Sequence, residues 1–329
     1  MDEIDWTQLK DLLRKEKCTP IISHSLSQNT LFGSQDMITA WAEQERYPLA
    51  DKDNVARVAQ YMTVLRRERP AKMRYLSFMR QALFAAAQKE KGQEPFLTTL
   101  EAELSELTVA QVAERLNRLQ ALQEATHPFT ILASLPIRVY LTTSYYDFLE
   151  RALRQAGKEP VSDYYRWSER LKQPGEGLDK NFQPTIDRPL VYHLHGVETN
   201  VDSMVLTEDN YFEFFDTFSH DLRDQNTSDL PNWVRYALSR SALLLLGYDI
   251  QHWAFRVLFR GEVKKMINQN REQGLPHVAI QLQPDPRAGI ADTEPFADYL
   301  NRFFAEHTFS VFWGDSTQFL QSLWQKYQG

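Results

Sequence analysis

The stretch ALLLLGYD, at residues 242–249, decides the fold of this sequence. Its five apolar residues, Ala242 to Leu246, follow one another without alternation, which is typical of a strand buried on both faces of a parallel sheet. Five further runs of similar character occur at residues 19–23, 137–141, 190–194, 277–282 and 309–312. Segments with helical spacing separate most of these runs. The sequence therefore predicts an α/β fold with a Rossmann-like, doubly wound and mostly parallel sheet of about six strands.

A long helical segment interrupts this alternation of strands and helices. Between residues 51 and 128, apolar side chains such as Val55, Val58 and Met62 recur at helical spacing, and no strand pattern is visible. We therefore expect a single domain over residues 1–329 with a helical insertion. The expected boundaries are 17–50 and 129–329 for the Rossmann-like core and 51–128 for the insertion.

Composition excludes several classes of protein. Of the 329 residues, 43% are hydrophobic and 25% charged, as in ordinary globular proteins. The net charge of −7 disfavours a nucleic-acid binder. The acidic N-terminus lacks the apolar segment of a signal peptide, and no apolar run approaches the ~20 residues of a membrane helix. We expect a cytoplasmic protein with neither a membrane nor a nucleic acid as partner.

Glycine and cysteine are both scarce. There are only 12 glycines, and the only G-x-G pair, Gly175 and Gly177, lies in a polar loop, so a GxGxxG fingerprint and a P-loop are absent. The single cysteine, Cys18, excludes a disulfide framework and a zinc finger or ribbon, which need several thiolates. Because no base accompanies Cys18 in the sequence, we interpret it as a buried structural residue rather than a nucleophile.

Polar residues follow four of the expected strands. In a doubly wound sheet, ligands bind beyond the carboxyl ends of the strands, near the point where the strand order reverses. The residues at those ends are Ser23, His24, Ser25, Thr142, Thr143, Ser144, His193, His195, Gly196, Gly247, Tyr248 and Asp249. This topological argument predicts a site but does not name its ligand.

Two histidines and a basic stretch leave alternatives open. His193 and His195 are two apart on a strand, so we expect them to share a face, as a metal site would need, but spacing supplies no third ligand. His195 could equally end the strand as a hydrogen-bonded residue or act as a general base near neutral pH. The basic residues Arg66, Arg67, Arg69, Lys72, Arg74 and Arg80 could contact phosphate or an acidic partner, or form a solvated helix face.

Seven stretches together resemble the bacterial sirtuin-like domains. They are PIISHSLSQNTLFGS (20–34), WAEQERYPLADKDNVARVAQY (41–61), TTSYYDFLERAL (142–153), PLVYHLHG (189–196), LTEDNYFEFF (206–215), LLLLGYDIQHWAFRVLFRG (243–261) and SVFWGD (310–315). The resemblance spans residues 15–327, in the order of the family. It implies a Rossmann-like NAD-binding sheet with a helical insertion. Members of that family are commonly NAD-hydrolysing effectors of bacterial anti-phage defence.

The resemblance also implies a site, which this sequence matches only in part. The family has a Gly-Ala-Gly turn near the pyrophosphate, an asparagine after a Thr-Thr pair and a histidine before glycine that acts as general base. The matching residues are Thr142, Thr143, His195, Gly247, Tyr248 and Arg256. The turn instead holds Ser23, His24 and Ser25, and Ser144 replaces the asparagine. Tyr146 stands at an acidic position although Asp147 remains, and His252 and Ala254 replace an Asp and an Asn.

These departures favour a sirtuin-fold protein with a degenerate NAD site, acting as a non-catalytic or weakly nucleotide-binding interaction or regulatory subunit in anti-phage defence. A protein partner or a homo-oligomer is then expected. One alternative is an NAD hydrolase that uses His195 as general base and Ser144 to position the ribose. Another is a different nucleotide or anion at Ser23, His24 and Ser25. NAD is thus a candidate ligand, whereas zinc and protein deacetylation are not expected, because the sirtuin deacetylases need a four-cysteine zinc module.

Overall fold

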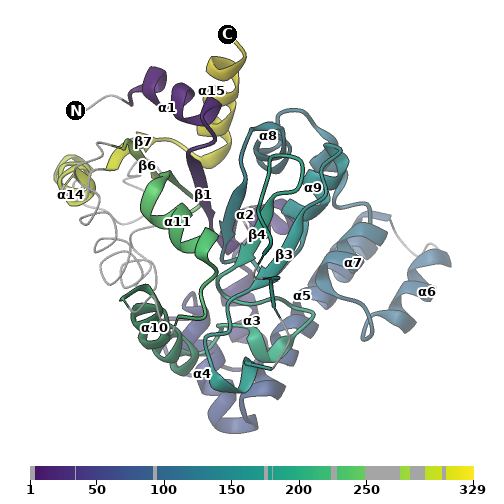
Figure 1. Cartoon of the computed structure of the whole chain (residues 1–329). Coiled ribbons are helices and arrows are strands. Elements are labelled where there is room, and N and C mark those ends of the chain that lie inside the picture. Colours follow the sequence, from purple (N-terminus) through teal and green to yellow (C-terminus); the bar gives the residue numbers. More distant parts are fainter. Residues whose placement is uncertain are drawn as a thin grey trace.

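Seven parallel strands form one sheet in the order β3-β4-β2-β1-β5-β6-β7 (Figure 1). This computed structural model describes residues 4–33, 35–91, 95–173, 177–179, 181–223, 228–248, 275–281, 293–305 and 309–329. The strands are β1 (Cys18–Ile22), β2 (Val139–Thr142), β3 (Val161–Tyr164), β4 (Leu190–His193), β5 (Ala242–Leu246), β6 (His277–Gln281) and β7 (Phe309–Trp313). The α/β class and the parallel sheet are confirmed.

All six expected strands are present, and β3 is the one that the sequence analysis missed. Its four residues, VSDY, lie at the edge of the sheet and are mostly half-buried. An edge strand with polar residues lacks the continuous apolar run by which β5 is recognised.

The strand order reverses between β1 and β5. From β1 the chain passes to β2 on one side and continues to β3 and β4, and it then returns to β5 on the other side of β1. β1 and β5 pair in parallel from Cys18 opposite Ala242 to Ile22 opposite Leu246. Ligands of doubly wound sheets bind at such a reversal, so the residues that follow β1 and β5 mark the candidate site.

Helices cover both faces of the sheet. They are α1 (Trp6–Arg14), α2 (His24–Phe32), α3 (Met37–Gln44), α4 (Val55–Arg66), α5 (Glu68–Lys91), α6 (Pro95–Glu103), α7 (Val109–Arg115), α8 (Pro128–Ser134), α9 (Phe148–Gln155), α10 (Glu208–Arg223), α11 (Asn232–Arg240), α14 (Thr293–Ala305) and α15 (Ser316–Gln328). Short 3-10 helices are η1 (Gln120–Gln123), η2 (Glu169–Leu171) and η3 (Val201–Ser203). None of the helices in these ranges is long and apolar enough to span a membrane.

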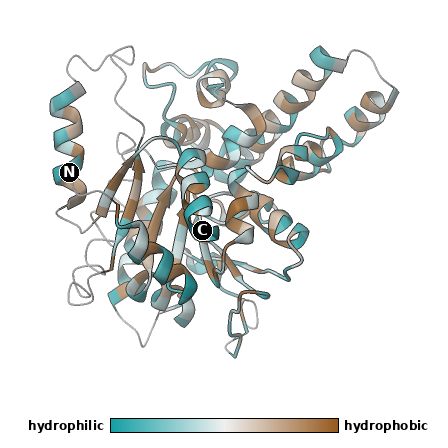
Figure 2. Cartoon of the chain, turned by 90° about the horizontal axis from the view of Figure 1, so that it is seen from above, coloured by the Kyte–Doolittle hydropathy of each residue, from teal (hydrophilic) through white to brown (hydrophobic). Residues whose placement is uncertain are grey.

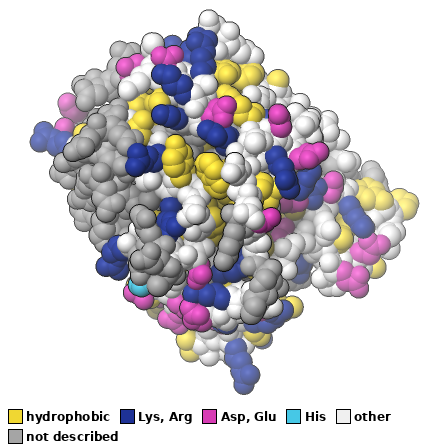
Figure 3. Space-filling model, in the orientation of Figure 1, with side chains coloured by type: hydrophobic (Ala, Val, Ile, Leu, Met, Phe, Trp, Pro, Cys, Tyr) yellow, Lys and Arg dark blue, Asp and Glu magenta, His cyan; other side chains and the backbone are white. Residues whose placement is uncertain are grey.

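Successive side chains of each strand point to opposite faces of the sheet, and a hydrophobic core therefore forms on each face. Val191 and Leu244 point toward the helices that include α8, α9 and α15, while Tyr192 and Leu245 point toward α10, α11 and α14. Several strands of the sheet are accordingly brown, the colour of hydrophobic residues, in Figure 2. The face seen in Figure 3 carries acidic and basic side chains interspersed with one another.

Helices α4 to α7, here called the helical block (residues 55–115), gather beside the carboxyl ends of the strands (Figure 1). Helices α4 and α5 form a hairpin whose corner residue, Arg67, has a positive φ of 74°. Arg66, Arg67 and Arg69 of the basic stretch are exposed, whereas its other residues are bonded or buried. Arg74 bonds Glu45, Arg80 donates to the carbonyl of Leu107, and Lys72 is fully buried.

Candidate active site

The start of helix α2, directly after β1, is closed by the chain's own side chains. Ser23 is the N-cap, and its hydroxyl accepts a hydrogen bond from the Ser25 N–H at 3.2 Å. The His24 N–H donates to the Thr143 hydroxyl at 3.1 Å, and the Leu26 N–H donates to the Ser23 carbonyl at 3.2 Å. All three first-turn N–H groups, which would otherwise attract an anion, therefore already have acceptors.

The end of β5 packs closely against this turn. The Ser25 hydroxyl donates to the Gly247 carbonyl at 2.5 Å and lies 3.0 Å from the Ser23 hydroxyl. Gly247 has a φ of +76°, and a Cβ there would lie 3.2 Å from the Ser25 hydroxyl and 3.3 Å from the Ser23 Cβ. The two serines and Gly247 are thus in close contact at the point where the strand order reverses.

The Thr142–Ser144 turn after β2 lies beside α2 and is buried. The Thr142 hydroxyl donates to the Ile22 carbonyl and accepts from the Ser144 N–H. The Ser144 hydroxyl lies 2.8 Å from the Ser27 hydroxyl and accepts from the Tyr146 N–H at 3.2 Å. The hydroxyls of Thr143 and Tyr248 are 3.4 Å apart. Ser144 is therefore engaged within the protein.

His24 lies between the two serines of the turn and packs among aromatic rings. Its ring centroid is 4.6 Å from that of Tyr145 and 5.1 Å from that of Tyr146, and its Nε2 is 3.3 Å from the Tyr75 hydroxyl. Its Nδ1 is buried and has no hydrogen-bond partner among the described residues. Burial lowers the pKa of His24 to about 3, so the imidazole is neutral at pH 7.

His193, at the end of β4, and His195, just beyond it, point to different helices, which corrects the expectation of a shared face. His193 bonds Glu150 of α9, whereas the ring of His195 stacks edge-on against Tyr211 and Phe214 of α10. The reason is that β4 ends at His193, so the period of two no longer applies to His195. Within the described ranges, no three His, Cys, Asp or Glu side chains are arranged to hold a metal ion.

His195, the residue that the sequence analysis considers as a general base, is 8% exposed. Burial, together with the neighbouring His24 imidazole, lowers the pKa of His195 to about 3. The ring is therefore unprotonated at neutral pH and can accept a proton, although its low basicity weakens it as a general base.

The remaining predicted residues lie as follows. Asp147 is paired with Arg151 at 2.8 Å and its side chain is 42% exposed. Cys18 is buried at the amino end of β1, away from the strand ends that carry the site, as expected of a structural residue. Asp249, His252, Ala254 and Arg256 lie outside the described residues.

Two buried carboxylates were not anticipated. Glu150 pairs with His193, and Glu198 accepts hydrogen bonds from the N–H groups of Val109 at 2.6 Å and Ala110 at 3.1 Å. Glu198 follows His195 by three residues, which is the only local hint of its importance. Its partners lie 88 and 89 residues away in the chain, and no sequence pattern connects them.

Comparison with known proteins agrees with this architecture. The model of the SIR2-like domain family matches residues 138–309, more than half of the chain. An NAD(+) hydrolase ThsA of Enterococcus faecium is 34% identical over 175 residues, which are 53% of this chain and 32% of that protein. Another NAD(+) hydrolase ThsA, of Acinetobacter baumannii, is 34% identical over 89 residues, 27% of this chain and 16% of that protein. The two matches thus cover a third or less of the length of these relatives. Because the family model matches more than half of the chain, the chain belongs to the SIR2-like domain family.

Proposed function

We propose that this protein is a SIR2-like protein whose nucleotide site is closed by its own side chains. It acts as an interaction or regulatory subunit in bacterial anti-phage defence, through a protein partner or a second copy, and does not hydrolyse NAD. The observation that carries this proposal is the capped start of α2, where the hydroxyls of Ser23 and Thr143 accept two of its first N–H groups.

The hydrogen bonds of this turn argue against NAD as its ligand. A pyrophosphate at the start of a helix is held by first-turn N–H groups that point at it, and a glycine-rich turn lets the backbone approach. Here those N–H groups are taken, and Ser23 and Ser25 place side chains against Gly247. Displacing each internal hydrogen bond would cost about 0.5–1.5 kcal/mol. The same bonds argue against another anion at Ser23, His24 and Ser25.

The Ser144 turn supports the same proposal. Its hydroxyl is engaged by Ser27 and by the Tyr146 N–H, so it is not free to orient a ribose or a water molecule. A hydroxyl also offers fewer hydrogen-bonding positions than the amide of the asparagine that it replaces.

Reversion of the turn tests the proposal. Purified wild-type protein is incubated with NAD, and nicotinamide release and NAD-dependent thermal shift are followed. We expect neither signal in the wild type. The triple variant Ser23→Gly, Ser25→Gly, Ser144→Asn should gain saturable NAD binding, whereas Ser105→Gly, at an exposed position, should not.

NAD hydrolysis is the second candidate function, because two relatives carry that activity in their names and His195 and the Thr142–Thr143 pair are retained. Nicotinamide release by the wild type that is lost in His195→Ala would establish it and refute the closed-site proposal. Release that persists in His195→Ala would instead contradict the assignment of His195 as base.

A further inference from the structure

The segment that carries His195 is held along its length by the helical block. This segment, residues 195–214 (the His195 segment), leaves β4, forms η3 and supplies the first turns of α10. It meets the helical block at three places, formed by α7, α5 and α4. The hydrogen bonds and ion pairs at these places join residues that are 88 to 151 positions apart in the chain.

The first contact joins Glu198 to α7. The Glu198 carboxylate is 7% exposed and accepts the N–H groups of Val109 and Ala110, while its own N–H donates to the Tyr145 carbonyl. A carboxylate is favourably placed at a helix N-terminus, where N–H groups lack partners within the helix. Glu198 thus links the turn after His195 to the helical block.

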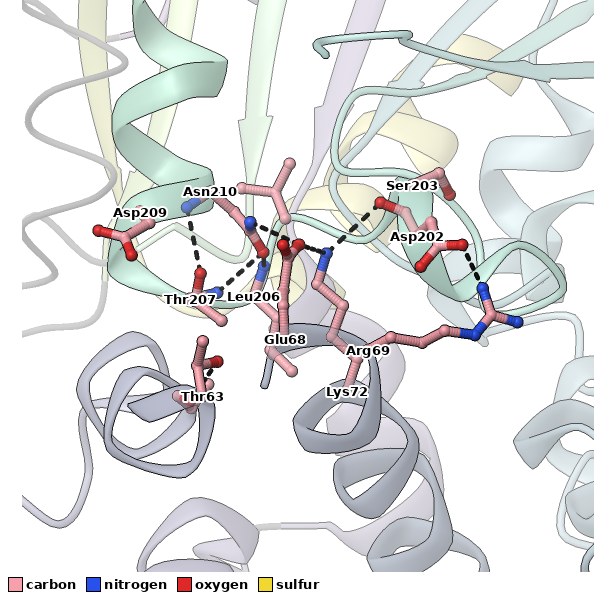
Figure 4. Close-up of polar contacts among 12 residues, drawn as sticks. Thr63, Glu68, Arg69, Lys72, Asp202, Ser203, Leu206, Thr207, Asp209 and Asn210 are labelled. Atoms are coloured by element: carbon pink, nitrogen blue, oxygen red, sulfur yellow. Dashed lines mark hydrogen bonds and ion pairs between the residues drawn. The ribbon is translucent and has the colours of Figure 1, made fainter. Parts of the chain in front are cut away.

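The second contact is a partly buried ionic cluster centred on Glu68 at the start of α5 (Figure 4). The Glu68 carboxylate bonds the ammonium of Lys72 at 2.7 Å, the guanidinium of Arg170 at 2.6 Å and the side-chain amide of Asn210 at 2.9 Å. Lys72 also lies 3.4 Å from the Asp202 carbonyl, and Arg69 pairs with the Asp202 carboxylate. The cluster therefore ties α5 to both η3 and α10.

The third contact joins α4 to the start of α10. Arg57 bonds Glu208 at 3.2 Å. The Gln60 side chain donates to the Asp209 carboxylate at 2.7 Å and accepts from the Asp209 N–H at 3.2 Å. These bonds fix the helix whose next turns place Tyr211 and Phe214 against the His195 ring.

We propose that the helical block is a clamp that keeps His195 covered, and that loosening its polar contacts with α10 exposes His195 while the sheet stays folded. Two rings of α10, Tyr211 and Phe214, contact His195. The bonds to Arg57, Gln60 and Glu68 hold the start of that helix. The ion pair at the start of α10 is partly exposed, so this end of the helix can open locally at lower cost than the apolar core to which Tyr211 and Phe214 belong. The inference does not depend on whether NAD is bound or hydrolysed.

Histidine labelling of the full chain tests the clamp. Diethyl pyrocarbonate modifies unprotonated imidazole, and mass spectrometry reports the rate at each histidine. His220, whose side chain is 60% exposed, is the exposed reference, and His277, which is 5% exposed on β6, reports global unfolding. In the wild type, His195 should react much more slowly than His220.

Two variants should open the clamp. Arg57→Ala combined with Gln60→Ala removes partly exposed contacts and leaves the core intact. Asn210→Asp keeps the side-chain oxygen that accepts from the N–H groups of Leu206 and Thr207 but places a carboxylate against Glu68. In each we expect the labelling rate of His195 relative to His220 to rise about tenfold, with His277 still protected.

The control is Glu103→Gln, which breaks the pair with Arg115 inside the helical block and does not touch the His195 segment. It should label like the wild type. The proposal is overturned if His195 reacts as fast as His220 in the wild type, if both clamp variants label like the wild type, or if His277 becomes reactive together with His195. Nicotinamide release is not part of the readout, so this failure is distinct from failure of the proposed function.

Discussion

The imidazole of His193 lies 2.8 Å from the carboxylate of Glu150, and both side chains are almost completely buried. The Nδ1 of the same ring donates to the Ser144 carbonyl at 2.7 Å, so both ring nitrogens face acceptors. This arrangement favours an imidazolium–carboxylate pair beneath the Ser144 turn. Burial alone would lower the pKa of His193 and raise that of Glu150, but their mutual attraction reverses both shifts.

We predict that Glu150→Ala is strongly destabilising, by about 3–5 kcal/mol, because it leaves a buried imidazole without its counter-charge. Urea unfolding of the variant and the wild type measures the difference. Ser162→Ala is the control, since it removes only the neutral hydroxyl that donates to Glu150 and should cost about 1 kcal/mol. Equal losses in the two variants would contradict a charged pair.

The same pair predicts a window of pH dependence. The folded-state pKa of His193 is raised above 6.5, so its contribution is complete below pH 6.5 and is lost as the pH rises through that raised pKa. The folded-state pKa of Glu150 is lowered below 4.5, so its contribution is complete above pH 4.5 and is lost as the pH falls through that lowered pKa. The stability difference between wild type and Glu150→Ala should therefore be greatest between pH 4.5 and 6.5, as urea titrations across this range would show.

Gly196 should tolerate no side chain. It has a φ of +78°, and a Cβ would lie 2.1 Å from the Ser203 carbonyl oxygen. Gly157 is a matched control, because its φ is +79° but nothing lies within 4 Å of a Cβ there. Gly157→Ala should cost about 1 kcal/mol in urea unfolding, from the backbone alone. Gly196→Ala should cost several times more or prevent folding, and similar losses at the two positions would refute the clash.

Glu198 should make stability depend on pH in the opposite sense to an ordinary ion-paired carboxylate. Burial raises its folded-state pKa to about 7, although the two N–H groups of α7 partly counteract this. Because this value exceeds the unfolded pKa of 4.5, folding takes up a proton, and stability should fall as pH rises from 4.5 through 7. Melting temperatures measured between pH 4.5 and 7 test this expectation. The fall in stability that Glu198 causes should be absent from Glu198→Gln, whereas the variant Glu106→Gln, at an exposed position, should retain it.

Cys18 should be inert in the folded protein. It is 3% exposed, and burial raises its pKa far above the usual value, so almost no thiolate forms at neutral pH. A thiol reagent such as dithiobisnitrobenzoate should modify one thiol per chain, that of Cys18, when the protein is unfolded in denaturant. It should hardly react with the native protein. Rapid stoichiometric reaction of the native protein would contradict the placement of Cys18 at the buried start of β1.

The local pattern of apolar residues was sufficient to predict the strands that are buried on both faces. ALLLL at 242–246 and LVYH at 190–193 show their environment in their own residues, because a strand covered on both faces needs continuous apolar character. The edge strand β3 lacks that signal and was missed. Topology then brought Ser23, Thr143 and Gly247 to one edge of the sheet, as the strand-end argument anticipated.

The sequence by itself determined the parallel sheet and the edge at which its polar residues meet. It did so because periodicity and burial act over a few neighbouring residues. Only the tertiary structure decided how those residues are used: that Thr143 caps the N–H of His24, that His193 turns to Glu150, and that Glu198 reaches α7. Each of these bonds joins residues more than 40 positions apart. Such pairs are set by how helices pack on the finished sheet, and no local pattern of side chains encodes them.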